Sequence, residues 1–484
     1  PPLNNAAGKE KYARKVLDSC CEAIRQSTPR NQHSTRLKKA RLIGGYIQYI
    51  DEGEVITALE AAVRDSGAKD IKASMRTVRD GLEDGKRNPI ILENRPEPGA
   101  SSCQRADPPE PEDGKPQILI IDGKLPQMTD QAEEILIDEG KENPEGGIYQ
   151  RGNQLVRIIS ADAGDSHGVY RKEQGAKIIH PIDPPYIQDR LTRNVNLYKF
   201  DSRKKAWFHK NCPRNIADTL LARVGEWNLP RLRAIIETPI IRPDGTILDK
   251  PGYDAKTGFL FIPNYKYEQI DRNPTKEEAE DALAAIIEAI HTFPFNTFAD
   301  QSVGIAALMT ALLRPALPTA PVIGFTAPMA GTGKSKFVDG ASVLATGKPA
   351  AVIGQGGNDE ETEKRLHWAL LQGDRIVCID NIERALKGQP LCQMVTQTII
   401  QARILGQTKK VDIPSTATFF ATGNNLTFSG DMLRRALLCR LDPKCERPEE
   451  RKFDQDFVDL VRSRRNEMVN ACLTVIRAYY VADT

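Results

Sequence analysis

Five short apolar runs constrain the fold of the C-terminal part of this chain. The runs are Pro321–Thr326, Ala350–Gln355, Arg375–Asp380, Thr416–Thr422 and Ala436–Leu441. Stretches with helical spacing separate most of them. Because strands that alternate with helices form parallel sheets covered on both faces, we expect an α/β fold with a five-stranded parallel sheet here.

The segment after the first run has the composition of a phosphate-binding loop. It reads PMAGTGKS from Pro328 to Ser335, with proline at the position where the usual pattern has glycine. Such loops bind phosphates because backbone N–H groups and a helix N-terminus point at the anion. Pro328 can form the turn out of the strand, and the phosphates do not need the N–H that it lacks. The residues predicted to hold the nucleotide are Ala327, Pro328, Met329, Ala330, Gly331, Thr332, Gly333, Lys334, Ser335 and Lys336.

Specific roles follow from the positions of three residues. We expect Lys334 to reach the outer phosphates and Ser335 to bind Mg²⁺. Asp380 ends an apolar run, so it should lie beside the loop at a strand's carboxyl end and hold the same ion through water. ATP and Mg²⁺ are therefore the predicted cofactors.

The residue that activates the attacking water is less clearly marked. ATPases of this kind usually carry glutamate directly after the aspartate, but Asn381 stands there and cannot take a proton. Glu383 is the candidate base, and the alternative is a solvated carboxylate at a helix start. Asn424 is the candidate that orients the water, and the alternative is a plain Gly–Asn turn.

Arg434 and Arg435 directly precede the last apolar run. Placed on the far edge of one subunit, such an arginine would reach the ATP of a neighbouring subunit and stabilise the charge of phosphoryl transfer. The alternative interpretation is a surface salt bridge.

These elements, in this order and compact spacing, resemble the AAA+ ATPases and, within them, the superfamily-three helicases of viruses, phages and plasmids. The resemblance covers residues 321–445 and includes the TGN of Thr422–Asn424. It implies an AAA+ P-loop core in a hexameric ring that hydrolyses ATP between subunits and moves three-prime to five-prime along one DNA strand. Pro328 and Asn381 depart from the family pattern.

A basic hairpin is expected between a helix at residues 390–402 and the run that starts at Thr416. Lys409 and Lys410 lie at or near its tip. In the helicases that the chain resembles, a hairpin at this place projects into the pore, so the resemblance assigns DNA-phosphate binding to both lysines. We expect the hairpin to share one sheet with the Asp380 strand. The alternative is a solvated basic turn.

The rest of the chain divides by composition. The expected order is a helical domain (1–92), a Pro- and acid-rich linker (93–117), a mixed α+β domain (118–270), a helical collar (271–318), the ATPase domain (319–445) and a C-terminal helix (446–484). The helical N-terminal region looks like the segment that follows the catalytic domain in phage and plasmid primase–polymerases. A primase domain or partner upstream is therefore expected.

Composition limits the partners. The net charge is +2, so contact with nucleic acid depends on local basic clusters. In one such cluster, residues 201–210, Trp207 and Phe208 could stack bases, although strand aromatics more often belong to a core. No apolar run can span a bilayer, no signal peptide opens the chain, and nine scattered cysteines fit a reducing cytoplasm.

The leading hypothesis is an ATP-dependent DNA helicase that acts on single-stranded or forked DNA as a hexameric ring in the replication of a phage or plasmid. The alternative is an ATP-switched replication initiator or DNA-binding ATPase that does not unwind processively. A protein-remodelling ATPase fits less well, because the expected hairpin offers lysines where such machines place aromatic side chains.

Overall fold

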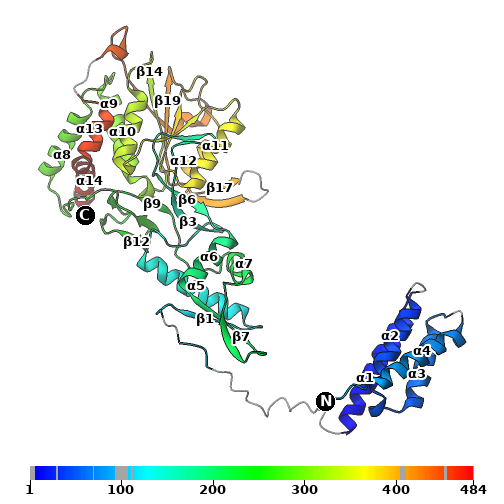
Figure 1. The fold of residues 1–484 in the computed structure, drawn as a ribbon. Helices are drawn as coiled ribbons and strands as arrows, with labels where there is room; N and C mark the ends of the chain where they lie inside the picture. The colour runs from blue at the N-terminus through cyan, green and yellow to red at the C-terminus, as the bar shows by residue number, and fades with distance from the viewer. Residues whose placement is uncertain are drawn as a thin grey trace. The chain divides into compact units, whose positions relative to one another are not determined.

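The computed structural model describes residues 6–28, 31–68, 70–92, 107–110, 113–403, 410–451 and 455–482. The chain divides into two compact units, residues 1–107 and 108–484. Figure 1 shows the helices and strands of each unit.

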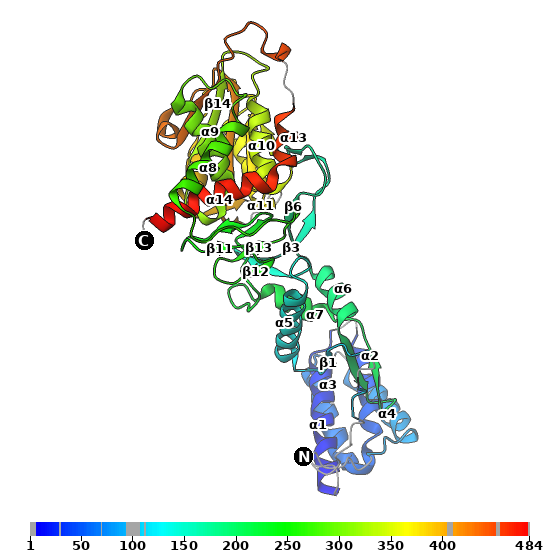
Figure 2. The same cartoon turned by 90° about the vertical axis from the view of Figure 1, so that its left-hand side faces the viewer.

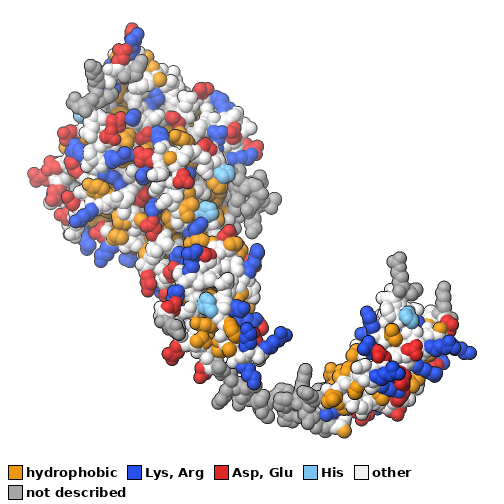
Figure 3. All heavy atoms as spheres, in the orientation of Figure 1, with side chains coloured by type: hydrophobic (Ala, Val, Ile, Leu, Met, Phe, Trp, Pro, Cys, Tyr) orange, Lys and Arg blue, Asp and Glu red, His pale blue; other side chains and the backbone are white. Residues whose placement is uncertain are grey.

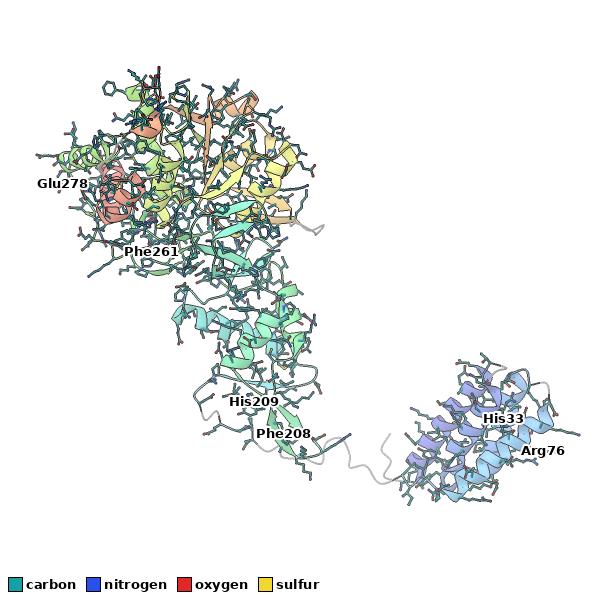
Figure 4. The ribbon with its side chains drawn as sticks, turned by 45° about the horizontal axis from the view of Figure 1, so that its top comes forward. His33, Arg76, Phe208, His209, Phe261 and Glu278 are labelled. Atoms are coloured by element: carbon teal, nitrogen blue, oxygen red, sulfur yellow. The ribbon has the colours of Figure 1, made fainter. Side chains whose placement is uncertain are left out.

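The first unit contains four α-helices in its described residues: α1 (Ala6–Arg25), α2 (Gln32–Gly44), α3 (Glu52–Asp65) and α4 (Ile71–Arg87). Figure 4 labels His33 on α2 and Arg76 on α4. These two helices cross closely because glycines face each other; a Cβ on Gly85 would lie 2.2 Å from the Arg41 carbonyl oxygen. Apolar side chains of all four helices form one core.

The second unit begins with a small α/β layer. Strands β1 (Gln117–Ile120), β7 (Asn196–Asp201) and β8 (Ala206–His209) form a sheet in the order β1-β7-β8. Helices α5 (Leu125–Glu142), α6 (Pro184–Asn194) and α7 (Arg214–Ala222) pack on one face of this sheet, through Ile118 and Leu197.

Three further small sheets follow. The first joins β2 (Tyr149–Arg151), β3 (Gln154–Ser160) and β6 (Lys177–Pro181); the second joins β9 (Ala234–Ile236), β12 (Gly252–Asp254) and β13 (Phe259–Phe261); the third pairs β10 (Ile240–Ile241) with β11 (Ile247–Leu248). The last is a hairpin whose turn includes Asp244 and Gly245, with Gly245 at a φ of 79°.

The largest sheet has seven strands in the order β20-β14-β19-β16-β15-β5-β4. Its parallel strands are β14 (Val322–Ala327), β15 (Ala351–Gly354), β16 (Ile376–Asp380), β19 (Thr418–Asn424) and β20 (Ala436–Arg440). They coincide with the five apolar runs, so the predicted parallel sheet is confirmed. The antiparallel strands β5 (Val169–Arg171) and β4 (Gly164–Ser166) extend one edge and were not predicted.

Helices cover both faces of this sheet. One core joins it to α8 (Lys276–Ala289), α9 (Phe298–Leu313), α10 (Lys334–Thr346), α13 (Phe457–Ser463) and α14 (Arg465–Ala482). The opposite core joins it to α11 (Asp359–Gln372) and α12 (Gln389–Thr396). Figure 2 shows α8, α9, α10 and α14 on the side of the sheet that faces the viewer. Helix α8 begins with a capping box formed by Thr275 and Glu278.

Two expectations about the hairpin are wrong. The helix expected at 390–402 ends at Thr396, because the β-branched pair Ile399–Ile400 instead enters β17 (Ile399–Arg403) and pairs antiparallel with β18 (Lys410–Pro414). These two strands form a separate two-stranded sheet and do not join the strand of Asp380. Across the described ranges, no helix is both long and apolar enough to cross a membrane.

Candidate nucleotide site

A cavity of about 700 Å³ lies at the carboxyl ends of β14, β16 and β19. In the sheet, the chain leaves β14 toward β15 on one side and leaves the neighbouring β19 toward β20 on the other, so the connections of these two adjacent strands run in opposite directions. In α/β sheets, ligands bind at such a switch point. The described residues that line the cavity include Ala330–Lys336, Asp380, Asn381 and Asn424.

The loop that enters the cavity has the geometry of an anion-binding turn. Gly331 and Gly333 have φ values of 75° and 94°, a left-handed conformation that side chains rarely adopt. Gly333 precedes α10 and provides no side-chain cap. The N–H groups of the first helical turn therefore remain available to a phosphate.

Lys334 reaches across the cavity mouth to the end of β19. Its Nζ donates hydrogen bonds to the Met329 carbonyl (3.0 Å), Thr332 Oγ1 (3.2 Å) and Asn424 Oδ1 (2.9 Å). Burial lowers the pKa of the Lys334 ammonium, and the nearby Asp380 opposes that shift. A partly buried cation held by neutral acceptors is well placed to gain an anionic ligand.

Asp380 lies directly beside Ser335, the residue that follows Lys334. Ser335 Oγ donates a hydrogen bond of 3.1 Å to Asp380 Oδ1, and Thr422 Oγ1 donates to the same oxygen. A hydroxyl and a carboxylate are hard oxygen ligands of the kind that Mg²⁺ prefers, so Ser335 and Asp380 fit the predicted ion. No role was predicted for Thr422, although it lies in the TGN motif.

Asn381 follows in the left-handed conformation, with a φ of 54°. Asparagine tolerates this conformation better than glutamate does, so the backbone gives a physical reason for the amide at this position. Asn381 lines the cavity, whereas Glu383 is not among the described residues that line it. The structure therefore does not bring the candidate base to the site.

The two predicted arginines lie at the other end of the sheet. Arg434 ends the short 3-10 helix Gly430–Arg434 and is exposed, and Arg435 directly precedes β20. Because β20 runs parallel to β14, its amino end is opposite the edge that holds the phosphate loop. Arg435 pairs with Asp431 of its own chain, as the salt-bridge interpretation expects.

The outer residues of the predicted loop have different surroundings. Ala327 and Pro328 line a neighbouring cavity of about 400 Å³ together with Asn425 and Arg440. Met329 contributes its carbonyl to Lys334. Lys336 lines the nucleotide cavity but donates a hydrogen bond of 2.7 Å to Asp456, which raises the pKa of Lys336.

Sequence reasoning missed the opposite wall of the cavity. Its described residues are Thr292, Phe293, Pro294, Pro448, Arg451, Gln455, Asp456 and Phe457. The rings of Phe293 and Phe457 meet edge to face at 4.8 Å, and Arg451 donates a hydrogen bond of 2.7 Å to the Thr292 carbonyl. One of these segments precedes the ATPase motifs in the sequence, and the other follows them. Their only sequence signal is the aromatic residues of FPF (293–295) and RKFDQDF (451–457).

The predicted DNA-binding lysines lie on the separate hairpin. Lys409 lies outside the described residues, and Lys410 is the exposed first residue of β18. The turn between β2 and β3 supports this strand. Asn153 Nδ2 donates a hydrogen bond of 3.1 Å to the Lys410 carbonyl, and a Cβ on Gly152 would lie 1.8 Å from the Asp412 carbonyl oxygen.

Comparisons with known proteins give only distant likenesses. No protein-family model matches the sequence, and no curated protein matches it either. Among solved structures, the apo C-terminal region of NrS-1 is similar at 12% identity and a TM-score of 0.34, over 71% of this chain and 68% of that one. An active helicase, Cch of SCCmec type IV, is similar at 16% identity and a TM-score of 0.27, over 68% and 62%. JCV helicase bound to a substituted acetamide is similar at 9% identity and a TM-score of 0.22, over 41% and 60%. Likenesses at this level decide neither fold nor activity, which depend on the geometry of the chain itself.

Proposed function

We propose that this chain is an ATP-dependent DNA helicase that works as a hexameric ring in the replication of a phage- or plasmid-type element. The supporting observation is the convergence of Lys334, Ser335, Asp380 and Asn424 in one cavity at the N-terminus of α10. Four separate polar groups meet there at the switch point of a parallel sheet, which is where a triphosphate would bind.

The loop and Lys334 would bind the phosphates. The N–H groups of the loop and of the first turn of α10 supply donors without a conformational change. The Lys334 ammonium would exchange its Met329 and Asn424 acceptors for phosphate oxygens. That exchange would leave Asn424 Oδ1 free to face the cavity. An amide there can then orient an attacking water.

Bound Mg²⁺ would neutralise charge on the phosphates, and Ser335 and Asp380 are the residues that would hold it. Asn381 and Asn424 can orient water by hydrogen bonds, but neither amide can accept its proton. Phosphoryl transfer depends mainly on positioning and electrostatic stabilisation, so these residues can support hydrolysis without a strong base.

The hairpin of β17 and β18 would be the DNA contact of the motor. Lys410 begins β18, and the chain continues directly from β18 into β19, which ends at Asn424. A shift of Asn424 with the nucleotide state can therefore reach the hairpin along one continuous segment. Lysine contacts to phosphates ignore base sequence, as translocation along DNA requires.

Assembly into a ring would complete the catalytic site. In the described part of the chain, β20 is the last strand on its side of the sheet; Asn296 and Asp300 bond to Arg440 at the carboxyl end of its outer edge, and Arg434 and Arg435 lie at its amino end. A neighbouring subunit's nucleotide could receive one of these arginines in exchange for the Asp431 ion pair of Arg435. Mixing Arg435→Ala with Lys334→Ala subunits should restore part of the ATPase activity, because some interfaces in a mixed ring keep both residues. Mixed rings without any restored activity would contradict this role.

An ATP-switched initiator is the second candidate function. The observation in its favour is Asn381 in place of a carboxylate, with Glu383 outside the cavity lining. Unwinding of tailed forks of each polarity, together with particle mass in ATP, separates the two. A helicase should unwind the fork with a three-prime tail, and its ATPase should rise with single-stranded DNA. A switch should show slow hydrolysis that DNA does not stimulate.

A further inference from the structure

The sheet β1-β7-β8 carries aromatic side chains on the face opposite its helices. Leu197 is buried against α5, α6 and α7. Because side chains alternate along a strand, Tyr198 and Phe200 lie on the face opposite Leu197, away from the helices. Their cross-strand partners are His209 and Trp207, which therefore share that face.

The four rings form two contacting pairs. Tyr198 and His209 meet edge to face with ring centres 5.6 Å apart, and Phe200 and Trp207 do the same at 5.4 Å. His209 is exposed, and the other three side chains are partly exposed. Phe208, which lies between Trp207 and His209 in β8, is on the other face, and Lys204 Nζ lies 4.8 Å from its ring centre. Figure 4 labels Phe208 and His209 on β8.

Four cations lie at the ends of β7 and β8, and two of them are on the helical side of the sheet: Lys204 Nζ lies over Phe208, and Lys210 lines a cavity with residues of α5 and α7. Arg203, Lys204 and Lys205 form the turn between β7 and β8, and Lys210 follows β8. Within the described ranges, none of the four pairs with a carboxylate. Asp201, the nearest acidic residue in sequence, instead accepts hydrogen bonds from the backbone N–H groups of the turn. Figure 3 shows Lys and Arg side chains beside hydrophobic ones over β7 and β8.

We propose that this face binds single-stranded nucleic acid, separately from the ATP-dependent hairpin. Bases would stack on the ring pairs, and Arg203 and Lys205 of the turn would contact phosphates. The charge favours this occupant over an apolar protein surface, since two cations without carboxylate partners in the described residues would lose water at such an interface. The binding needs no nucleotide, so it stands or falls independently of the proposed helicase activity.

The test is fluorescence anisotropy of a labelled oligothymidylate with the full chain, without ATP, over a range of salt concentrations. For single strands, each phosphate contact contributes roughly 0.7 to the slope of log affinity against log salt. The double variant Arg203→Ala, Lys205→Ala should therefore bind more weakly and lower that slope by about 1.4. The control is Arg193→Ala with Arg214→Ala, which removes two exposed arginines that pair with Asp189 and Asp218 on the helical side.

The aromatic contribution needs its own variants. His209→Ala and Tyr198→Ala should each weaken binding by about fivefold or more, since stacking on one ring is worth roughly 1–3 kcal/mol per base. Tyr198→Phe keeps the ring and should bind normally, and unchanged melting temperatures show that the variants fold. Unchanged affinity and salt slope in the double variant and in His209→Ala would overturn the proposal. Variants that change particle mass or protein binding but leave DNA binding intact would also overturn the proposal.

Discussion

Lys334 Nζ donates a hydrogen bond of 2.9 Å to Asn424 Oδ1, although the two residues are 90 positions apart in sequence. This contact joins the phosphate loop to the end of β19, the strand that continues from the hairpin. It leaves the ammonium and the amide facing one cavity, with Asp380 within the same lining. A phosphate that binds Lys334 must displace one of the three acceptors of its ammonium, and displacement of Asn424 would free that amide for a new partner.

Removal of the Lys334 ammonium should abolish hydrolysis. We expect Lys334→Ala to lower the rate of phosphate release by at least about 100-fold, as loss of a preorganised electrostatic contact to the transition state typically does. The matched control is Lys364→Ala, because that exposed lysine of α11 pairs with Glu360 and is not among the described residues that line the cavity. A Lys334→Ala protein that hydrolyses ATP as fast as the control would remove the loop from the mechanism.

The conformation of Asn381 makes a prediction about stability. Its φ of 54° suits asparagine or glycine. Asn381→Gly should leave the free energy of unfolding nearly unchanged, whereas Asn381→Glu should lower it by roughly 1 kcal/mol or more. Urea denaturation of both variants measures the difference. Equal stability of the Glu and Gly variants would show that the backbone does not select the amide.

The turn between β2 and β3 should control the response to DNA. Gly152→Ala places a Cβ 1.8 Å from the Asp412 carbonyl oxygen and must displace either the turn or β18. We expect DNA stimulation of the ATPase to fall several-fold while hydrolysis without DNA continues. Gly225→Ala is the matched control, since Gly225 also has a positive φ, of 88°, but has nothing within 4 Å of the added carbon. The same loss in both variants would point to backbone strain alone.

Part of the fold could be predicted from the sequence, because the signals for that part are local. The five parallel strands could be predicted because each is a short apolar run between turn residues. Strands β4 and β5 could not, because Gly164–Ser166 and Val169–Arg171 are three residues each, pair with each other, and join the large sheet only where Tyr170 meets Val352. The helix expected to reach residue 402 ended early because strand pairing prevailed over helical spacing at Ile399–Ile400.

The candidate site likewise has residues that the sequence could predict and residues that it could not. Lys334, Ser335 and Asp380 meet because the carboxyl ends of parallel strands share one edge of a sheet, which spacing alone can indicate. Phe293 and Arg451 also line the cavity, but they come from segments on either side of the motifs and meet only through tertiary packing. No pattern within either segment could have paired them.

A buried carboxyl should make the stability of the second unit depend on pH. Glu237 is 7% exposed, and burial raises its pKa to about 7, against the opposing charges of Arg375, Arg465, Lys177 and Lys348. Both arginines donate hydrogen bonds to backbone carbonyls, so their charge only partly offsets the lost hydration.

The sign of the effect follows from the raised pKa. The folded chain holds this proton more tightly than the unfolded chain, in which the glutamate has its ordinary pKa of 4.5. The stability that Glu237 contributes is therefore fully present below pH 4.5 and is lost as the pH rises to about 7. The loss should be on the order of 3 kcal/mol. Glu237→Gln should flatten this part of the stability profile in urea denaturation at several pH values, and Glu277→Gln on the exposed side of α8 should not. A Glu237→Gln profile that keeps the full slope would assign the pH dependence to other groups.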